Sequence, residues 1–263
     1  MQDNRVRSLV SVVFIGLLAC CASEAATVSY GDRVGTGFLF NNIIEDSAAS
    51  TFLGSGVATN LPYPTVASNS LVFANTRLGT AAAVGGAVFN SSSTSYQFTV
   101  KALTNNSITS LDFLVNGSYN LVSIGNPANA LFDVTLPFTI SVVGANGSAY
   151  AGGSKTSSLT VNPVVPKQVS STNNAYVRDA GTWTANWAGI NGSTDLNQIF
   201  NIPTMKITEL MLSVDITAIA YRSNDTSSAT MNLNNFNVNV IPEPSTASLL
   251  LIGSLLALRR RRR

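Results

Sequence analysis

Apolar and polar residues alternate with a period of two along several stretches of the chain. The longest such stretch is residues 210–218, and shorter ones lie at 96–101, 136–142 and 236–240. Because successive side chains of a β-strand point to opposite faces, this pattern predicts strands with one buried and one solvent-facing side. The last stretch runs directly into Pro242, so we expect the folded body to close there.

Turn-forming residues separate the predicted strands. Asn116-Gly117 lies between the apolar stretches 111–115 and 119–124 and predicts a tight β-hairpin. Asn146-Gly147 predicts a second turn. Further loops are expected at Gly152-Gly153, at Asn191-Gly192 and in the polar stretch 90–95.

The connections between the strands indicate the class of fold. Pro163-Val164-Val165-Pro166 predicts a rigid link that carries the chain between two sheets, and residues 195–200 can form one short turn of helix. We see no repeat of fixed period, which argues against a solenoid. Short strands separated by turns predict an all-β body over residues 26–240, an antiparallel β-sandwich or jelly roll.

The N-terminal end differs from this body. Arg5 and Arg7 precede the apolar residues 9–19, and small residues follow. This order is typical of a secretory signal peptide, so we assign a signal helix to residues 1–25. Cleavage is expected after Ala22 or Ala25.

The same region also fits a second kind of export signal. Leu17-Leu18-Ala19-Cys20 matches a lipobox, in which Cys20 is lipidated and becomes the new N-terminus. We favour plain cleavage, because a lipid anchor would duplicate the membrane anchor at the other end of the chain.

Residues 241–263 combine three signals at the C-terminus. Pro242-Glu243-Pro244 is expected to be extended and exposed, because proline fixes φ and lacks an N–H. Residues 247–258 are uncharged and rich in Leu and Ala, which predicts a transmembrane helix about 18 Å long, short for a hydrocarbon core of about 30 Å. The chain ends in a block of arginines that we expect to remain on the cytoplasmic side: Arg259, Arg260, Arg261, Arg262 and Arg263.

This combination resembles the PEP-CTERM sorting signal of Gram-negative bacteria, and the resemblance covers residues 241–263. It implies that an exosortase, a membrane-embedded cysteine protease-transpeptidase, recognises Pro242, Glu243 and Pro244 and that the tail is lost. It also implies a producer that makes exopolysaccharide and often biofilm. The alternative is an ordinary C-terminal anchor in which the Pro-Glu-Pro occurs by chance.

Composition restricts the chemistry of the body. The chain has no histidine, and its two cysteines, Cys20 and Cys21, lie in the signal region. Ser-His-Asp and Cys-His catalysis and zinc sites built from His or Cys are therefore excluded. Residues 27–240 hold eight Lys or Arg against ten Asp or Glu, and the basic residues are scattered, so we expect no nucleic-acid partner. We expect no cofactor, no metal and no enzymatic activity.

Two weaker candidates for chemistry remain. Glu45-Asp46 is the only adjacent acidic pair, but neighbouring residues of a strand point to opposite faces, so a glycosidase would need a second carboxylate from elsewhere. Trp183 and Trp187 lie close together among hydrogen-bonding residues, which suits a carbohydrate contact. Core packing of these tryptophans is the alternative, and we favour it.

The sequence therefore predicts an exported surface or extracellular-matrix protein that an exosortase sorts. We expect an intermediate anchored in the inner membrane, followed by delivery to the cell surface or the matrix. A structural or adhesive role in exopolysaccharide or biofilm is the favoured function. The alternatives are a carbohydrate-binding module that uses Trp183 and Trp187, and a carboxylate-based glycan hydrolase.

Overall fold

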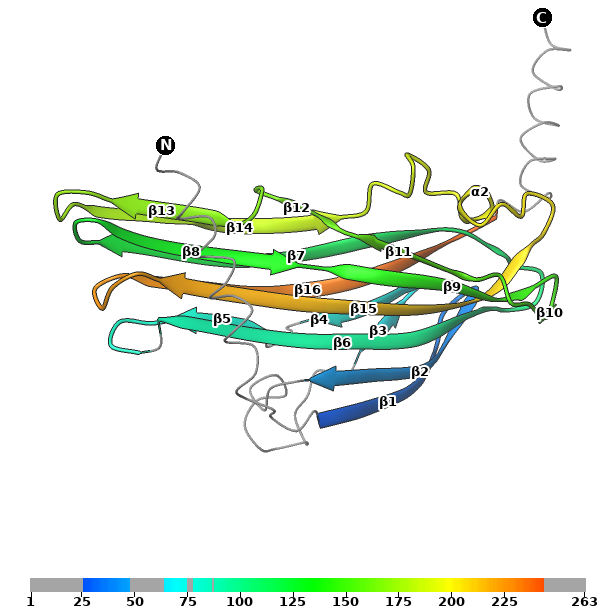
Figure 1. The fold of residues 1–263 in the computed structure, drawn as a ribbon. Coiled ribbons are helices and arrows are strands. Elements are labelled where there is room, and N and C mark those ends of the chain that lie inside the picture. Colours follow the sequence, from blue (N-terminus) through cyan, green and yellow to red (C-terminus); the bar gives the residue numbers. More distant parts are fainter. Residues whose placement is uncertain (1–25, 48–63, 75–77, 87, 244–263) are drawn as a thin grey trace, which may run out of the picture.

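The computed structural model describes residues 26–47, 64–74, 78–86 and 88–243 (Figure 1). Strands dominate this part of the chain, and the helix within it, α2 (Leu196–Ile199), is a single turn. No helix in these ranges has the length and apolar character needed to cross a membrane. The helices predicted in residues 1–25 and 247–258 lie outside the described residues.

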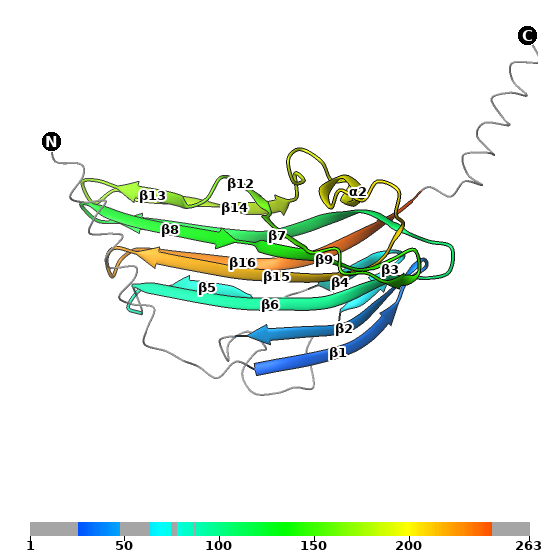
Figure 2. The ribbon, with the colours of Figure 1, turned by 45° about the vertical axis from the view of Figure 1, so that its right-hand side comes forward.

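The strands form two antiparallel sheets, one of them curled into a half-barrel (Figure 2). In the first sheet the order is β1 (Ala26–Val34), β2 (Phe38–Ser47), β6 (Phe89–Ala102), β15 (Ile207–Arg222), β8 (Ala128–Thr135) and β13 (Lys167–Ser171). The same sheet contains β9 (Pro137–Ala145), which pairs with β15, and β10 (Ser148–Ala149) and β11 (Ser154–Ser158), which pair with β9.

The second sheet has the order β12 (Thr160–Asn162), β14 (Tyr176–Asn186), β7 (Ile108–Ile124), β16 (Ser228–Pro242), β4 (Ser70–Ala74) and β3 (Thr65–Ala67). β5 (Gly79–Ala82) also pairs with β16. The prediction of an all-β body is thus confirmed at the level of two antiparallel sheets.

Two long strand pairs form the centres of the sheets. β15 lies along β6 in the first sheet, and β16 lies along β7 in the second. The chain passes from the first sheet to the second between β2 and β3, between β6 and β7, between β11 and β12, between β13 and β14, and between β15 and β16. The predicted link at 163–166 makes the reverse crossing, from β12 in the second sheet to β13 in the first, so its predicted course between the sheets is confirmed.

The apolar faces of the two sheets meet in one core. Aromatic pairs connect them: Phe113 and Phe138 have ring centroids 4.8 Å apart, and the rings of Tyr119 and Phe132 stack at 4.7 Å. The alternation predicted for residues 210–218 is confirmed, because the side chains at every second position are buried. Each large apolar side chain buried in this way stabilises the fold by about 1.5–3 kcal/mol.

The hairpin predicted at Asn116-Gly117 is wrong, because both residues lie in the middle of the continuous strand β7. Gly117 pairs with Trp183 on β14, and its missing side chain makes room for the indole. A Cβ on Gly117 would lie 2.4 Å from two indole atoms and 2.1 Å from the backbone oxygen of Asn232. Glycine is therefore present here to permit close packing and does not form a turn.

The loop predicted at residues 90–95 is also wrong, because these residues form the first half of β6. They pair with residues 215–220 of β15, so the neighbouring apolar strand gives this polar segment its extended form.

Three smaller predictions are confirmed. Asn146 and Gly147 have φ values of 52° and 77° and turn the chain from β9 into β10. Gly152-Gly153 lies outside the strands, and Asn191-Gly192 forms a turn. The predicted helical turn is α2, and the side chain of Asp195 caps it by accepting a hydrogen bond from the amide of Asn197 at 2.9 Å.

Candidate functional site

The sorting signal predicted from the sequence begins at the end of β16. Ile241 pairs with Ser110 and Pro242 with Ile108, and the register shifts between these two pairs. Proline has no N–H to donate to the ladder, so an irregularity at this position is expected. The next residue, Glu243, donates its backbone N–H to the carbonyl oxygen of Ser107 at 3.0 Å, which extends the contact with the body beyond the proline.

The carboxylate of Glu243 has two partners on the body. The hydroxyl of Ser107 donates a hydrogen bond to Oε2 at 2.6 Å, and Nζ of Lys206 lies 3.5 Å from the same oxygen. The hydrogen bond from Ser107 and the positive charge of Lys206 lower the pKa of Glu243. The side chains of Glu243 and Lys206 are 48% and 66% exposed, so water screens their attraction, whereas Ser107 is buried.

Separate loops position these two partners. Ser107 ends the connection between β6 and β7, in which Asn106 donates its side-chain amide to the carbonyl oxygen of Gly37 at 3.3 Å. Lys206 is fixed through its backbone, because its N–H donates to Oδ1 of Asn146 at 2.9 Å and its carbonyl accepts from the Asn146 N–H at 2.8 Å. The turn at Asn146 therefore helps to hold the lysine that faces Glu243.

Turns of both sheets meet at this end of the body, since hydrogen bonds and an ion pair join residues 37, 69, 106, 107, 146, 206 and 243. We call this region the exit end, and it comprises residues 35–37, 68–69, 103–107, 146–147, 206 and 243. The turn between β1 and β2 is on the right in Figure 1. Gly37 donates its N–H to Oδ1 of Asn69 at 3.1 Å, and Val240 donates its N–H to the Asn69 carbonyl at 3.0 Å. β16 is thereby fixed to two turns immediately before the sorting signal.

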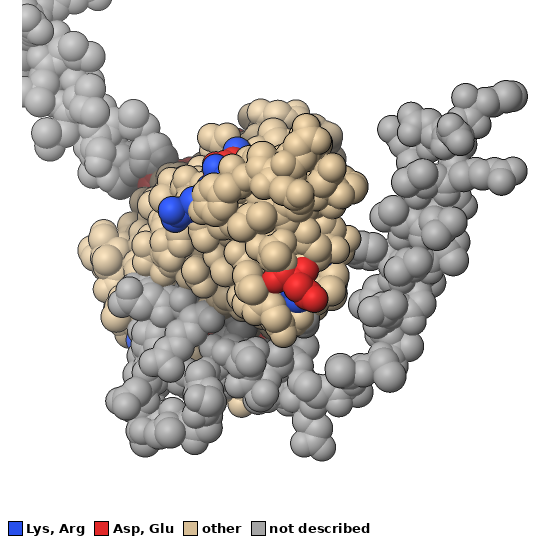
Figure 3. Space-filling model, turned by 90° about the vertical axis from the view of Figure 1, so that its left-hand side faces the viewer, with Lys and Arg blue, Asp and Glu red and all other residues tan. Residues whose placement is uncertain are grey.

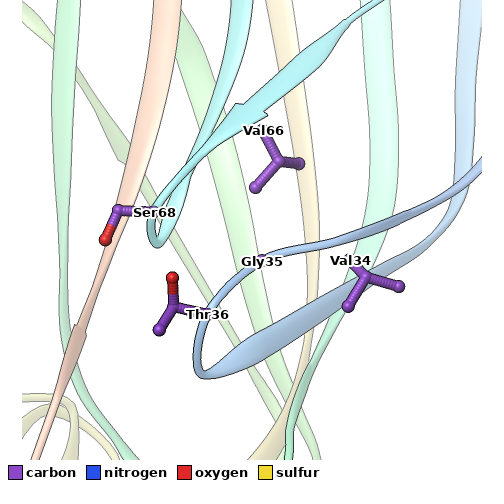
Figure 4. A pocket seen from close by; sticks show the side chains of 5 residues that line it. All are labelled: Val34, Gly35, Thr36, Val66 and Ser68. Atoms are coloured by element: carbon purple, nitrogen blue, oxygen red, sulfur yellow. The ribbon is translucent and has the colours of Figure 1, made fainter.

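A shallow surface hollow of about 260 Å³ lies at the exit end, between the β1–β2 and β3–β4 turns (Figure 4). Its lining contains no ionisable side chain: Val34, Gly35, Thr36, Val66 and Ser68. It therefore offers no acid, base or charged ligand for catalysis.

The two tryptophans lie in the core. Trp183 is 0% exposed and Trp187 is 7% exposed. The indole of Trp187 meets the rings of Phe113 and Phe138 edge-on, with centroid distances of 6.1 and 5.5 Å. Neither ring presents a face on which a sugar could stack in this fold, so core packing is their role here.

The adjacent acidic residues Glu45 and Asp46 lie in different environments. Glu45 is 3% exposed and accepts hydrogen bonds from the hydroxyls of Tyr30 at 2.5 Å and Thr94 at 3.1 Å, whereas Asp46 is exposed. Burial raises the pKa of Glu45. Within the described ranges, no three side chains of the types His, Cys, Asp or Glu are grouped so that they could hold a metal ion.

The remaining predicted site residues lie outside the described part of the chain: Pro244, Arg259, Arg260, Arg261, Arg262 and Arg263. The sequence predicts Pro242 and Glu243 as site residues but does not predict Ser107 and Lys206. Nothing in the local sequence marks those two, because they lie 136 and 37 residues away from Glu243.

Comparison with known protein families finds a match in the tail of the chain. Residues 240–263 match the PEP-CTERM protein-sorting motif. The chain therefore carries a signal that implies an exported protein, associated with a membrane before an exosortase processes it. The predicted resemblance is confirmed, and the match begins two residues before Pro242. No curated protein matches the chain.

Two solved structures are faintly similar to the chain. The VP2 subviral particle of infectious bursal disease virus is 11% identical over 84% of this chain and 59% of that chain, with a TM-score of 0.13. The T13 particle of the same virus is 11% identical over 85% of this chain and 58% of that one, with a TM-score of 0.13. This chain thus spans less than two thirds of those proteins.

Proposed function

We propose that this chain is a non-enzymatic protein of the cell surface or extracellular matrix, with a sandwich-type body that an exosortase separates from its tail. The observation that carries the proposal is the position of the sorting motif. β16 ends at Pro242, so removal of the residues that follow leaves every strand of the two sheets in place. The body can therefore persist in folded form after it leaves its inner-membrane anchor.

The outer face of the second sheet supports an adhesive role toward exopolysaccharide. Side chains of β14, β7 and β16 form rows there, such as Thr184 beside Asn116 beside Asn235. We call this surface the amide face, and it consists of Asn116, Ser118, Thr182, Thr184, Asn232 and Asn235. Amides and hydroxyls supply both donors and acceptors to a polymer of sugar hydroxyls.

The residue types on the amide face are better suited to binding a polymer than to stabilising the sheet. Asparagine is depleted in strands because it adds little to packing on a pleated surface. On the described outer face of the second sheet, the charged side chains are Asp112 and Arg178, towards its two ends. The outer face of the first sheet is more charged, with Asp46, Lys101, Asp133, Glu209 and Asp215.

A low charge is also visible elsewhere on the body. Figure 3 shows the end that lies on the left in Figure 1, where only a few charged side chains interrupt the uncharged described surface. An uncharged surface fits a neutral polymer, since neither partner has to lose the hydration of unpaired ions.

Co-sedimentation with exopolymer purified from the producing organism tests this role. We expect the mature protein to sediment with the polymer, and the double variant Asn116→Ala/Asn235→Ala to lose binding severalfold. These two amides are hydrogen-bonded to each other at 3.3 Å. The matched control is Thr139→Ala/Ser213→Ala, a cross-strand pair on the outer face of the first sheet. Equal binding by both double variants would contradict the adhesive role of the amide face.

A further inference from the structure

Three groups of the exit end hold Glu243. Its backbone N–H donates a hydrogen bond to the carbonyl oxygen of Ser107. Its carboxylate accepts a hydrogen bond from the hydroxyl of Ser107 and lies beside Lys206. In the neighbouring register position, Pro242 is still paired with Ile108 of β7. The central residue of the sorting tripeptide is thus a bound part of the body.

This arrangement holds Pro242 and Glu243 against the body. Three residues separate Glu243 from the start of the apolar segment at residue 247, a span of at most about 14 Å for extended chain. With residues 247–258 in the membrane, as the sequence predicts, the exit end lies close to the bilayer before processing. A membrane-embedded enzyme that reads Glu243 meets a carboxylate of which one oxygen, Oε2, already accepts a hydrogen bond from Ser107 and lies beside Lys206.

We propose that Ser107 and Lys206 are positioning residues that form a latch on Glu243 and compete with the exosortase for it. The inference rests on the proposed processing of the tail by that enzyme. In the latched form Pro242 and Glu243 remain on the body, and processing proceeds from the form in which Glu243 and the end of β16 have detached from β7. The body thereby sets the rate at which its own tail is removed.

Pulse–chase labelling of the full-length chain in the producing organism measures this rate. We expect Ser107→Ala/Lys206→Gln to shorten the half-time of tail loss about three- to tenfold, the factor that corresponds to one typical net hydrogen bond. Each single variant should lie between the double variant and the native chain. The single variant Lys206→Arg keeps the positive charge and should therefore show the native half-time.

The control variant is Ser123→Ala, at the opposite end of β7. Ser123 is a buried serine whose hydroxyl donates to the carbonyl oxygen of Ala128 at 2.8 Å, so its loss resembles the loss of Ser107 in chemistry but not in position. We expect it to leave the half-time unchanged. Equal acceleration by Ser123→Ala would assign the effect to loss of global stability and overturn the latch.

The remaining outcomes separate the latch from the proposed function. One outcome is that tail loss in the native chain depends on the exosortase while Ser107→Ala/Lys206→Gln does not accelerate it. That result would refute the latch and leave the proposed function standing. Slower loss in that double variant would show that the contact prepares Glu243 for the enzyme, and would refute competition. A native chain that keeps its tail whether or not the exosortase is present would overturn the proposed function and the latch together.

Discussion

Replacing Gly117 by alanine tests the packing at the centre of the second sheet. In the native structure Gly117 lies between Trp183 on one side and the backbone of β16 on the other. The added Cβ would lie 2.1 Å from the backbone oxygen of Asn232 and 2.4 Å from two atoms of the indole. Neither neighbour is a flexible side-chain end, since one is backbone and the other is a fully buried ring.

The expected loss of stability follows from this overlap. Overpacking a core typically costs about 1–3 kcal/mol, and two rigid neighbours place this site at the upper end of that range. The lower entropy of the unfolded alanine variant returns about 0.4–1 kcal/mol. We therefore expect Gly117→Ala to lose about 2–3 kcal/mol, which for a chain of this size lowers Tm by about 4–12 °C.

Thermal and urea unfolding of the purified protein measure this loss. The matched control is Gly181→Ala on β14, where the added Cβ meets only the end of the Tyr119 ring, at 3.1 Å from its hydroxyl oxygen. We expect the control to stay within about 0.5 kcal/mol of the native protein. If Gly117→Ala were as stable as Gly181→Ala, the close contact of β7 with Trp183 and β16 would be refuted.

Three further predictions concern buried or capping polar groups, each measured by urea unfolding. Glu45→Gln should be more stable than the native protein at neutral pH. Because burial raises the pKa of Glu45, the folded state binds the proton more tightly, and the native protein loses stability as pH rises from the unfolded towards the folded pKa. The Glu45→Gln variant should lack this loss of stability. If the free energy of unfolding of the native protein had the same pH dependence as that of the variant, this prediction would be contradicted. Asp195→Ala should cost about 1 kcal/mol by removing the cap of α2, and an unchanged midpoint would argue against that cap. Arg222→Met should cost about 3 kcal/mol, because the fully buried guanidinium donates to the carbonyl oxygens of Asn224 and Gly86; a loss below about 1 kcal/mol would contradict this.

The same dipeptide gave one correct and one incorrect prediction. Asn146-Gly147 forms the expected turn, with both residues at positive φ, whereas Asn116-Gly117 lies within a strand. The difference comes from Trp183, which needs a residue without a side chain at position 117 and lies far along the chain. Local sequence carries the turn propensity of Asn-Gly but not the identity of the strand beside it.

Patterns that depend on near neighbours were predictable. Strand alternation is set by the chain itself and by the presence of a core, so the buried positions of β15 could be read directly. The tail was also predictable because an enzyme reads it as a linear segment. The strand at residues 90–95 is not predictable from local sequence, because its extended form depends on pairing with β15, more than a hundred residues away.

The contacts of Glu243, like the pairing of residues 90–95, depend on residues that are distant in the sequence. Ser107 and Lys206 reach it only because β7 pairs with β16 and because the Asn146 turn holds the backbone of Lys206. The sequence therefore predicts which residues the sorting signal contains, while the folded body determines how Glu243 is held.

The central claim is that the body is exported and separated from its tail by an exosortase. Intact mass and cell fractionation of the native protein, in its own organism with and without the exosortase gene, test this most directly. We expect the protein from unmodified cells to lack the block from Arg259 to Arg263, and the protein from cells without the exosortase to keep it and to fractionate with the inner membrane. A native protein that still carries the arginine block in unmodified cells would contradict the account.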